Sequence, residues 1–252
     1  GLERRERLSL VLDLGTNGEM ALGNRHGIIA CATAAGPAFE GAAISCGTGG
    51  VAGAIDSLRW EDGRLVGTTI GGGAAVGVCG SGIIDAAACL VRGGLVDETG
   101  AMDEAWSAAG YPLDGAIDYG IGGTRGSGGS GDGKVGIRFS QADVRQIQLA
   151  KAAVAAGIAA MLDEAGAGLD DVETVFLAGG FGSYLRPESA AAIGLIPPAL
   201  LARVETVGNA AGHGALRMLL VRDEIAAMSS LAKAGRYIEL SGSDCFSDRS
   251  VE

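Results

Sequence analysis

The chain has 252 residues, of which 48% are hydrophobic, so it can bury a sizeable core in one large domain or two small lobes. Acidic residues outnumber basic ones by 30 to 19, and the net charge of -11 would repel the phosphates of a nucleic acid. No apolar run reaches the ~20 residues that a bilayer requires. We therefore expect no nucleic-acid partner, no membrane association and a cytoplasmic location.

Cysteine, histidine and glycine limit the chemistry further. The five cysteines form no CxxC pair, and only two histidines occur, so we expect reduced core cysteines and no zinc site or histidine-based triad. Catalysis would then depend on carboxylates, hydroxyls and backbone groups. Glycine is the outlier with 45 residues, and it recurs where a backbone turns sharply or approaches a ligand closely.

The N-terminal third predicts strands followed by a helix. Residues 1–7 are mostly charged, and we interpret them as a linker within a longer polypeptide. An antiparallel meander is predicted next, because three segments alternate or run apolar between glycine turns; they are residues 8–14, 19–24 and 28–33. A second hairpin is predicted over residues 54–70, around Asp62-Gly63. Residues 81–92 carry an apolar helical face and stop at Gly93-Gly94, which predicts a helix.

The middle of the chain contains a glycine-rich segment and a long helix. Residues 120–133 (GIGGTRGSGGSGDG) are interpreted as a surface loop, because a phosphate cradle would need a strand before it and a helix after it. Residues 135–139 predict a short strand. Ser140 and Asp143 then predict a capping-box start to a long helix.

The last third alternates strands and helices. Residues 171–178 form an apolar run that predicts a strand, which leads directly into glycines at 179–182. The remaining predicted elements are a helix over 186–193, a strand over 204–207, a helix over 208–220 and a polar tail over 241–252.

The stretch LVLDLGTNGEMALG at residues 10–23 has more polar residues than a hairpin needs. A tight turn requires only two residues such as Asn17-Gly18, so Asp13 and Thr16 are surplus. Surplus polar residues at a strand end suggest a ligand.

The order of these elements resembles one RNase H-like lobe of the actin, heat-shock chaperone and sugar kinase superfamily. The implied fold class is α/β, with a mixed sheet, helices on both faces and inserted hairpins over residues 8–240. In that superfamily a phosphate loop joins the first two strands, and the segment DLGTNGE at 13–19 fits this place.

The resemblance gives each residue of this loop a role. Asp13 would act as the catalytic and metal-binding residue and hold Mg²⁺ directly or through water, while Gly15 and Gly18 would let backbone N–H groups approach phosphate. Thr16 and Asn17 would donate hydrogen bonds. The alternative is a capped turn without a ligand.

Two further segments match the superfamily. The motif FLAGGFG fits the place where adenosine packs against bare backbone, which would involve Gly179, Gly180, Phe181 and Gly182; a tight strand-to-helix turn is the alternative. Lys151 lies on the preceding helix, where chaperone relatives carry a lysine that reaches the nucleotide, although a solvated lysine fits equally well.

The small-residue segment GNAAGHGA at 208–215 resembles the helix that crosses a partner helix at the hinge between two lobes. A plain buried helix is the alternative, because small residues also allow ordinary close packing. His213 is interpreted as structural.

Seven blocks in order resemble, more closely, the C-terminal region of the reductive activators of corrinoid proteins. They are DLGTNGEMALGN, CATAAGPAFEGAAISCG, VCGSGIIDAA, RQIQLAKAAVAAGI, FLAGGFG, IGLIP and VGNAAGHGA. This resemblance implies ATP and Mg²⁺ as cofactors. It also implies a methyl-transferring corrinoid protein as partner, whose cob(II)amide is reduced to Co(I).

The chain departs from the full pattern of those activators. It lacks the ferredoxin cysteine spacing, so a [2Fe-2S] cluster is expected only in an N-terminal domain absent from this chain. It also has a single DxGT motif, so we expect half of an ATPase site.

Two alternatives and one question stay open. The chain could be a lobe of a small-molecule kinase or of an acyl-CoA dehydratase activator, whose [4Fe-4S] cluster Cys46 and Cys79 could help to hold. A non-enzymatic module for nucleotide sensing or partner docking is the second alternative. Whether the chain forms a homodimer is also open.

Overall fold

A computed structural model describes residues 1–117, 136–180, 182 and 184–240. The glycine-rich segment at 120–133 and the tail at 241–252 lie outside them. The chain folds into two compact units: unit 1 comprises Gly1–Ala35, Ala152–Tyr184 and Leu195–Glu252, and unit 2 comprises Gly36–Lys151 and Leu185–Gly194. None of the helices in the described part of the chain is long and apolar enough to cross a membrane.

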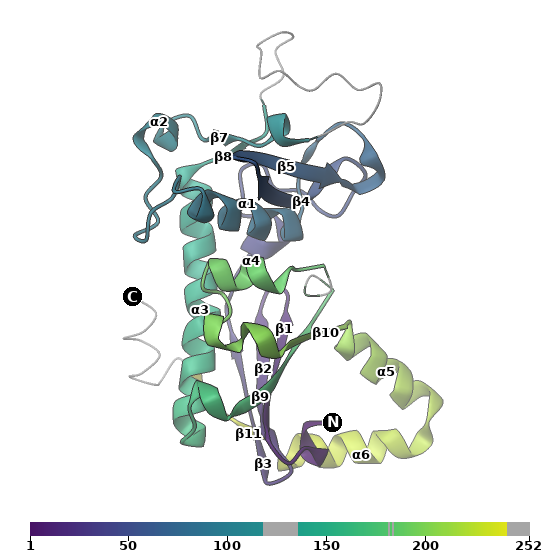
Figure 1. The fold of residues 1–252 in the computed structure, drawn as a ribbon. Coiled ribbons are helices and arrows are strands. Elements are labelled where there is room, and N and C mark those ends of the chain that lie inside the picture. Colours follow the sequence, from purple (N-terminus) through teal and green to yellow (C-terminus); the bar gives the residue numbers. More distant parts are fainter. Residues whose placement is uncertain (118–135, 181, 183, 241–252) are drawn as a thin grey trace. The chain divides into compact units, whose positions relative to one another are not determined.

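Unit 1 is built on a six-stranded mixed sheet with the order β10-β9-β1-β2-β3-β11 (Figure 1). Its strands are β1 (Leu8–Leu14), β2 (Gly18–Asn24), β3 (Gly27–Thr33), β9 (Val172–Ala178), β10 (Val204–Gly208) and β11 (Arg236–Tyr237). β1 pairs antiparallel with β2 and parallel with β9, and β10 also runs parallel to β9. The meander and the two later strands are confirmed to within one residue, whereas β11, which pairs with β3, was not predicted.

Strand alternation gives this sheet a buried face and a half-exposed face. Leu10, Leu12 and Leu14 are fully buried, whereas Val11 and Asp13 between them are only partly covered. The unit 1 part of helix α3 (Gln141–Ala165) covers the buried face, where Gly157 lies so close to β2 and β3 that a Cβ there would stand 2.7 Å from Thr33 Cγ2. The residues of α3 up to Lys151 belong to unit 2.

The predicted capping box of α3 is confirmed. Asp143 Oδ2 accepts hydrogen bonds from Ser140 N at 2.8 Å and Ser140 Oγ at 2.7 Å, and Ser140 Oγ accepts one from Asp143 N at 3.2 Å. The same carboxylate also accepts hydrogen bonds from the backbone N–H and hydroxyl of Ser45. Six apolar residues along one face of this helix are all buried; they are Ile147, Ala150, Val154, Ile158, Met161 and Leu162.

Unit 2 contains two small sheets and short helices. Its strands are β4 (Ala54–Glu61), β5 (Arg64–Thr69), β6 (Gly77–Val78), β7 (Tyr111–Pro112) and β8 (Arg138–Phe139). Its α-helices besides the start of α3 are α1 (Gly80–Arg92), α2 (Glu104–Ser107) and α4 (Pro187–Ala192). Its 3-10 helices are η2 (Pro37–Glu40), η3 (Ile70–Gly72) and η4 (Asp114–Ala116); those of unit 1 are η1 (Leu2–Arg4), η5 (Leu169–Asp171) and η6 (Pro198–Arg203).

The turns that the sequence predicted in unit 2, at Asp62-Gly63 and after α1, are confirmed. Asp62 and Gly63 have φ angles of 48° and 75°, the left-handed pair that a two-residue hairpin turn requires. The predicted helix over 81–92 is confirmed as α1, which is followed by Gly94 at φ 68°. The predicted strand over 135–139 is wrong in extent, since Gly136 and Ile137 are described but not in a strand. Its partner β7 has two residues, Tyr111 and Pro112, and beyond them a single hydrogen bond from Leu113 N to the Ile137 carbonyl oxygen, at 2.8 Å, continues the pairing.

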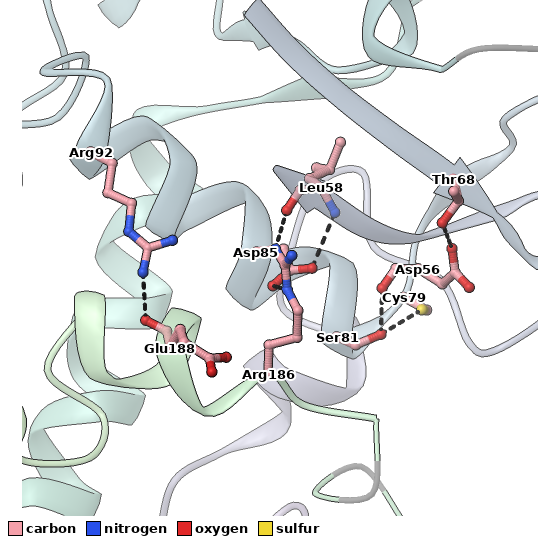
Figure 2. A network of polar contacts seen from close by, with 9 residues as sticks. All are labelled: Asp56, Leu58, Thr68, Cys79, Ser81, Asp85, Arg92, Arg186 and Glu188. Carbon is pink, nitrogen blue, oxygen red and sulfur yellow. Dashed lines mark hydrogen bonds and ion pairs between the residues drawn. The ribbon is translucent and has the colours of Figure 1, made fainter. Parts of the chain in front are cut away.

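A buried ion pair connects three elements of unit 2, as Figure 2 shows. The Asp85 carboxylate of α1 is almost fully buried; it lies 3.0 Å from Arg186 Nε and accepts a hydrogen bond from Leu58 N of β4 at 3.1 Å. Arg186, directly before α4, also donates to the carbonyl oxygen of Leu58. Nearby, Arg92 donates to the carbonyl oxygen of Glu188 at 2.8 Å.

Helices α5 (Ala210–Leu220) and α6 (Arg222–Ala234) form a bent arm of unit 1 (Figure 1). The arm leaves the sheet at β10 on one edge and returns at β11 on the other. Helix α5 is confirmed, whereas α6 was not predicted. Neither helix, both described throughout, has a buried residue. The alternative of a plain buried helix over 208–215 is therefore wrong.

Candidate functional site

The carboxyl ends of two adjacent parallel strands bring together Asp13 and the glycine turn. Asp13 near the end of β1 pairs with Ala178, the last residue of β9, and Gly179 follows directly. A Cβ on Gly179 would stand 2.7 Å from Asp13 Oδ1 and 2.6 Å from the Leu14 carbonyl oxygen. These two predicted site residues therefore lie side by side, at the edge where α/β sheets bind ligands.

The Asp13 carboxyl is in an unfavourable place for a negative charge. Burial raises its pKa, and the carboxylate of Glu19, directly opposite on β2, raises it further. The side-chain carboxylate of Asp13 accepts no hydrogen bond from the described residues. A cation would relieve this repulsion, and carboxylate oxygens are ligands that Mg²⁺ prefers.

Glu19 was not predicted as a site residue. The register of the predicted hairpin contained the signal, because it places residue 19 opposite residue 13 on the same face. In the described part of the chain, no three His, Cys, Asp or Glu side chains form a potential metal cluster. A Mg²⁺ ion here would take its remaining ligands from water or phosphate, which is its usual mode of binding to nucleotides.

The turn between β1 and β2 exposes two of its predicted ligand residues. Gly15 N donates to Asn17 O at 2.9 Å, which closes the turn and leaves Thr16 and Asn17 exposed. Gly18 is buried in β2, where a Cβ would stand 2.9 Å from Thr33 Oγ1. Packing alone therefore explains the glycine at 18, whereas Gly15 is not crowded.

The glycine turn after β9 separates into crowded and open positions. Gly179 has a φ of 102° and donates to the Gly208 carbonyl oxygen at 3.0 Å, and a Cβ on Gly182 would overlap the Ala178 carbonyl oxygen. Both glycines are required by the turn itself. Gly180 is different, because a Cβ there would meet no atom of the described residues within 4 Å. Phe181 lies outside the described residues.

A third strand ends at the same edge. β10 ends at Gly208, and Asn209 follows as the N-cap of α5, accepting a hydrogen bond from Gly212 N at 2.8 Å. His213 is exposed on this helix.

Lys151 belongs to the other unit. There it borders a cavity of about 170 Å³ whose lining includes Val91, Ile147 and Ile193 together with the polar side chains of Glu98 and Gln148. A contact between Lys151 and a nucleotide stays a prediction.

The two cysteines considered for an iron–sulfur cluster both belong to unit 2. Burial and the nearby Asp143 carboxylate raise the pKa of the Cys46 thiol to about 12. Cys79 is buried, with its Sγ 3.5 Å from Ser81 Oγ.

Comparison with known proteins identifies the family. The family described as the C-terminal domain of RACo, the ASKHA domain, matches residues 7–252. The chain belongs to this family. The expected actin-like α/β fold class and the resemblance to reductive activators of corrinoid proteins are thereby confirmed.

Relatives of this RACo-type domain carry consistent names. The chain is 36% identical over 245 residues to the corrinoid activation enzyme RamQ of Eubacterium limosum, covering 95% of this chain and 41% of RamQ. It is 28% identical to the [Co(II) methylated amine-specific corrinoid protein] reductase of Methanosarcina barkeri, covering 89% of this chain and 41% of that protein.

A solved structure, titled reductive activator for corrinoid, iron-sulfur protein, matches with a TM-score of 0.84 and 35% identity. The match covers 100% of this chain and 40% of that one. The RACo-type chain therefore spans about two-fifths of the length of these relatives.

Proposed function

We propose that this chain is the ATP-binding lobe of a reductive activator that drives electron transfer to the cob(II)amide of a corrinoid protein and regenerates Co(I). The observation that carries the proposal is the position of Asp13 beside Gly179, at the carboxyl ends of adjacent parallel strands. It occurs in a family whose relatives are named for corrinoid activation and reduction.

Different residues of the chain would bind the Mg²⁺ ion, the phosphates and the adenosine of ATP. Asp13 would hold Mg²⁺, with Glu19 adding negative charge nearby, and the exposed Thr16 and Asn17 would donate to phosphate. The open backbone at Gly180 would receive adenosine, as the resemblance implies. When bound, Mg²⁺ would neutralise charge on the phosphates during their transfer.

The electron would come from elsewhere in the polypeptide. One electron from a reduced [2Fe-2S] cluster converts cob(II)amide to Co(I), and hydrolysis of ATP to ADP and phosphate makes this uphill step possible. Phosphoryl transfer needs groups that converge on the phosphates, and this chain supplies one set of them. We therefore expect the chain alone to bind ATP weakly.

Calorimetry with ATP and Mg²⁺ on the full-length protein tests the nucleotide site. Gly180→Val adds a branched side chain into open space where adenosine would pack, so we expect at least a tenfold loss of affinity, which corresponds to about 1.4 kcal/mol. Gly73→Val is the matched control, because a Cβ at Gly73 also meets nothing within 4 Å. Equal ATP affinity in both variants would contradict the assignment, and an absence of ATP binding by the wild type would favour a docking module.

A further inference from the structure

The cavity that Lys151 borders lies between three helices and a loop of unit 2. Its lining comes from α1, the first part of α3, the end of α4 and residues 96–100 (Figure 1). Four apolar side chains from these elements line it and are at most 7% exposed; they are Ala87, Val96, Ile147 and Ile193. Water has few hydrogen-bond partners against such a wall, so an apolar group of a ligand would replace it favourably.

Hydrogen bonds within unit 2 hold the wall of the cavity formed by residues 97–100. Asp97 Oδ1 accepts hydrogen bonds from Thr99 N at 2.9 Å, from Thr99 Oγ1 at 2.7 Å and from Ala101 N at 2.9 Å. The Thr99 carbonyl oxygen accepts another from Gln148 Nε2 of α3 at 3.0 Å. The chain itself therefore fixes this wall, as is usual for small-molecule sites.

Two side chains of opposite charge at this cavity have no partner in the described part of the chain. Lys151 is partly buried, and its Nζ reaches the end of α4, where a Cβ on Gly194 would stand 3.4 Å from it. Glu98 is exposed on the loop. Neither side chain forms an ion pair or hydrogen bond with a described residue. A cation partly removed from water favours an anionic group beside it, and Glu98 favours a cationic one.

We infer that this cavity binds a small zwitterion, namely an α-amino acid with a short aliphatic side chain. Its carboxylate would pair with Lys151, its ammonium group with Glu98, and its side chain would lie against the apolar lining. The cavity has a volume of about 170 Å³. Since a cavity of about 150 Å³ admits benzene, an amino acid of the size of valine fits this space.

A nucleotide is a less suitable occupant of this cavity. Its phosphates would lie beside the carboxylates of Asp97 and Glu98, which would repel them. Pockets for larger, drug-sized ligands have volumes of roughly 300–1,000 Å³. The inference thus gives Lys151 a different role from the predicted contact with a nucleotide, and it does not depend on ATP binding.

Calorimetry on the full-length protein with three related probes tests the charge requirement. L-Valine carries both charges, isovalerate lacks the ammonium group, and isobutylamine lacks the carboxylate. We expect L-valine to bind, and each analogue to bind at least tenfold more weakly because it leaves one charge of the site unpaired. An absence of L-valine binding would overturn the inference, and so would an analogue that binds as tightly as L-valine.

Two variants, each with a matched control, locate the binding. Lys151→Met removes the cation, and Lys233→Met makes the same change at an exposed position of α6. Val91→Trp adds bulk at the cavity where Val91 is 39% exposed, and Val51→Trp adds it to a loop of unit 2 where Val51 is 51% exposed.

We expect Lys151→Met and Val91→Trp to bind L-valine at least tenfold more weakly than the wild type, and both controls to bind it equally well. Equal affinities in a variant and its control would contradict binding in this cavity. A loss of Mg²⁺–ATP affinity in Val91→Trp with unchanged affinity for L-valine would assign the cavity to the nucleotide instead.

Discussion

At the scale of single residues, Asp13 is placed where its charge costs stability. Partial burial and Glu19 both raise its pKa, so the folded state holds the proton of this carboxyl more tightly than the unfolded state does. Above the raised pKa, the ionised carboxylate lowers stability; below the usual value near 3.8, both states are protonated and the penalty disappears. Such a residue is expected at a site that gains a cation.

Asp13→Asn should therefore raise the unfolding temperature at pH 7, although it removes a proposed Mg²⁺ ligand. The gain should shrink as the pH falls toward 3, because the wild-type carboxyl becomes neutral. Thermal unfolding of both proteins from pH 3 to 7 measures this, with Asp62→Asn in an exposed turn as the control. A lower unfolding temperature for Asp13→Asn at pH 7 would show that the carboxylate is stabilising.

The two glycines at 180 and 182 should respond differently to alanine. A Cβ at 182 would overlap the Ala178 carbonyl oxygen, so Gly182→Ala should cost roughly 1–3 kcal/mol of stability through forced backbone movement. Gly180→Ala should change stability little, because its Cβ enters open space. Urea unfolding of both variants measures the difference, and equal losses would mean that the turn is not as described.

At the scale of elements, the buried ion pair between Asp85 and Arg186 joins α1, β4 and the start of α4. Arg186→Leu would leave a buried carboxylate without its cation, which typically costs about 3–5 kcal/mol. Arg92→Leu removes an exposed hydrogen bond to Glu188 and should cost about 1 kcal/mol or less.

The double variant Asp85→Leu with Arg186→Leu removes both charges and should recover part of the loss. Thermal unfolding of the double variant and of the three single variants Asp85→Leu, Arg186→Leu and Arg92→Leu measures these effects. A loss in the double variant as large as the sum of the Asp85→Leu and Arg186→Leu losses would show that the two side chains act independently.

Elements with local signals were predictable from the sequence, whereas those that depend on distant partners were not. The meander, the second hairpin and α1 were confirmed because glycine turns and residue alternation mark them. β11 has two residues and exists only by pairing with β3. The strand at 135–139 was overestimated because its length depends on pairing with the two-residue strand β7, which lies far away in the sequence.

In the candidate site, too, some features could be predicted from the sequence and others could not. Asp13 and Gly179 could be predicted as neighbours, since parallel strands align their carboxyl ends. Glu19 was missed because its role follows from cross-strand register. The division into two units was not predictable either, because the continuous helix α3 contributes residues to both.

At the scale of the whole molecule, we propose that this chain supplies one half of an ATPase site. The chain spans 41% of each curated relative, and its described carboxylates form no complete metal cluster. We therefore expect ATP hydrolysis by the full-length protein to be slow and to speed up when a corrinoid protein docks, because closure of the site would couple the two events. Strong ATPase activity in the 252-residue chain alone would contradict the assignment of a half-site.

The most direct test follows the conversion of cob(II)amide to Co(I) by absorbance, with and without ATP. The samples are full-length wild type and full-length Asp13→Asn, each with reduced iron–sulfur cluster and corrinoid protein. We predict that ATP stimulates the reaction in the wild type and at least tenfold less in Asp13→Asn, while reduction of the cluster by an external donor is equal in both. Equal stimulation by ATP in the two proteins would remove Asp13 from the mechanism and contradict the account.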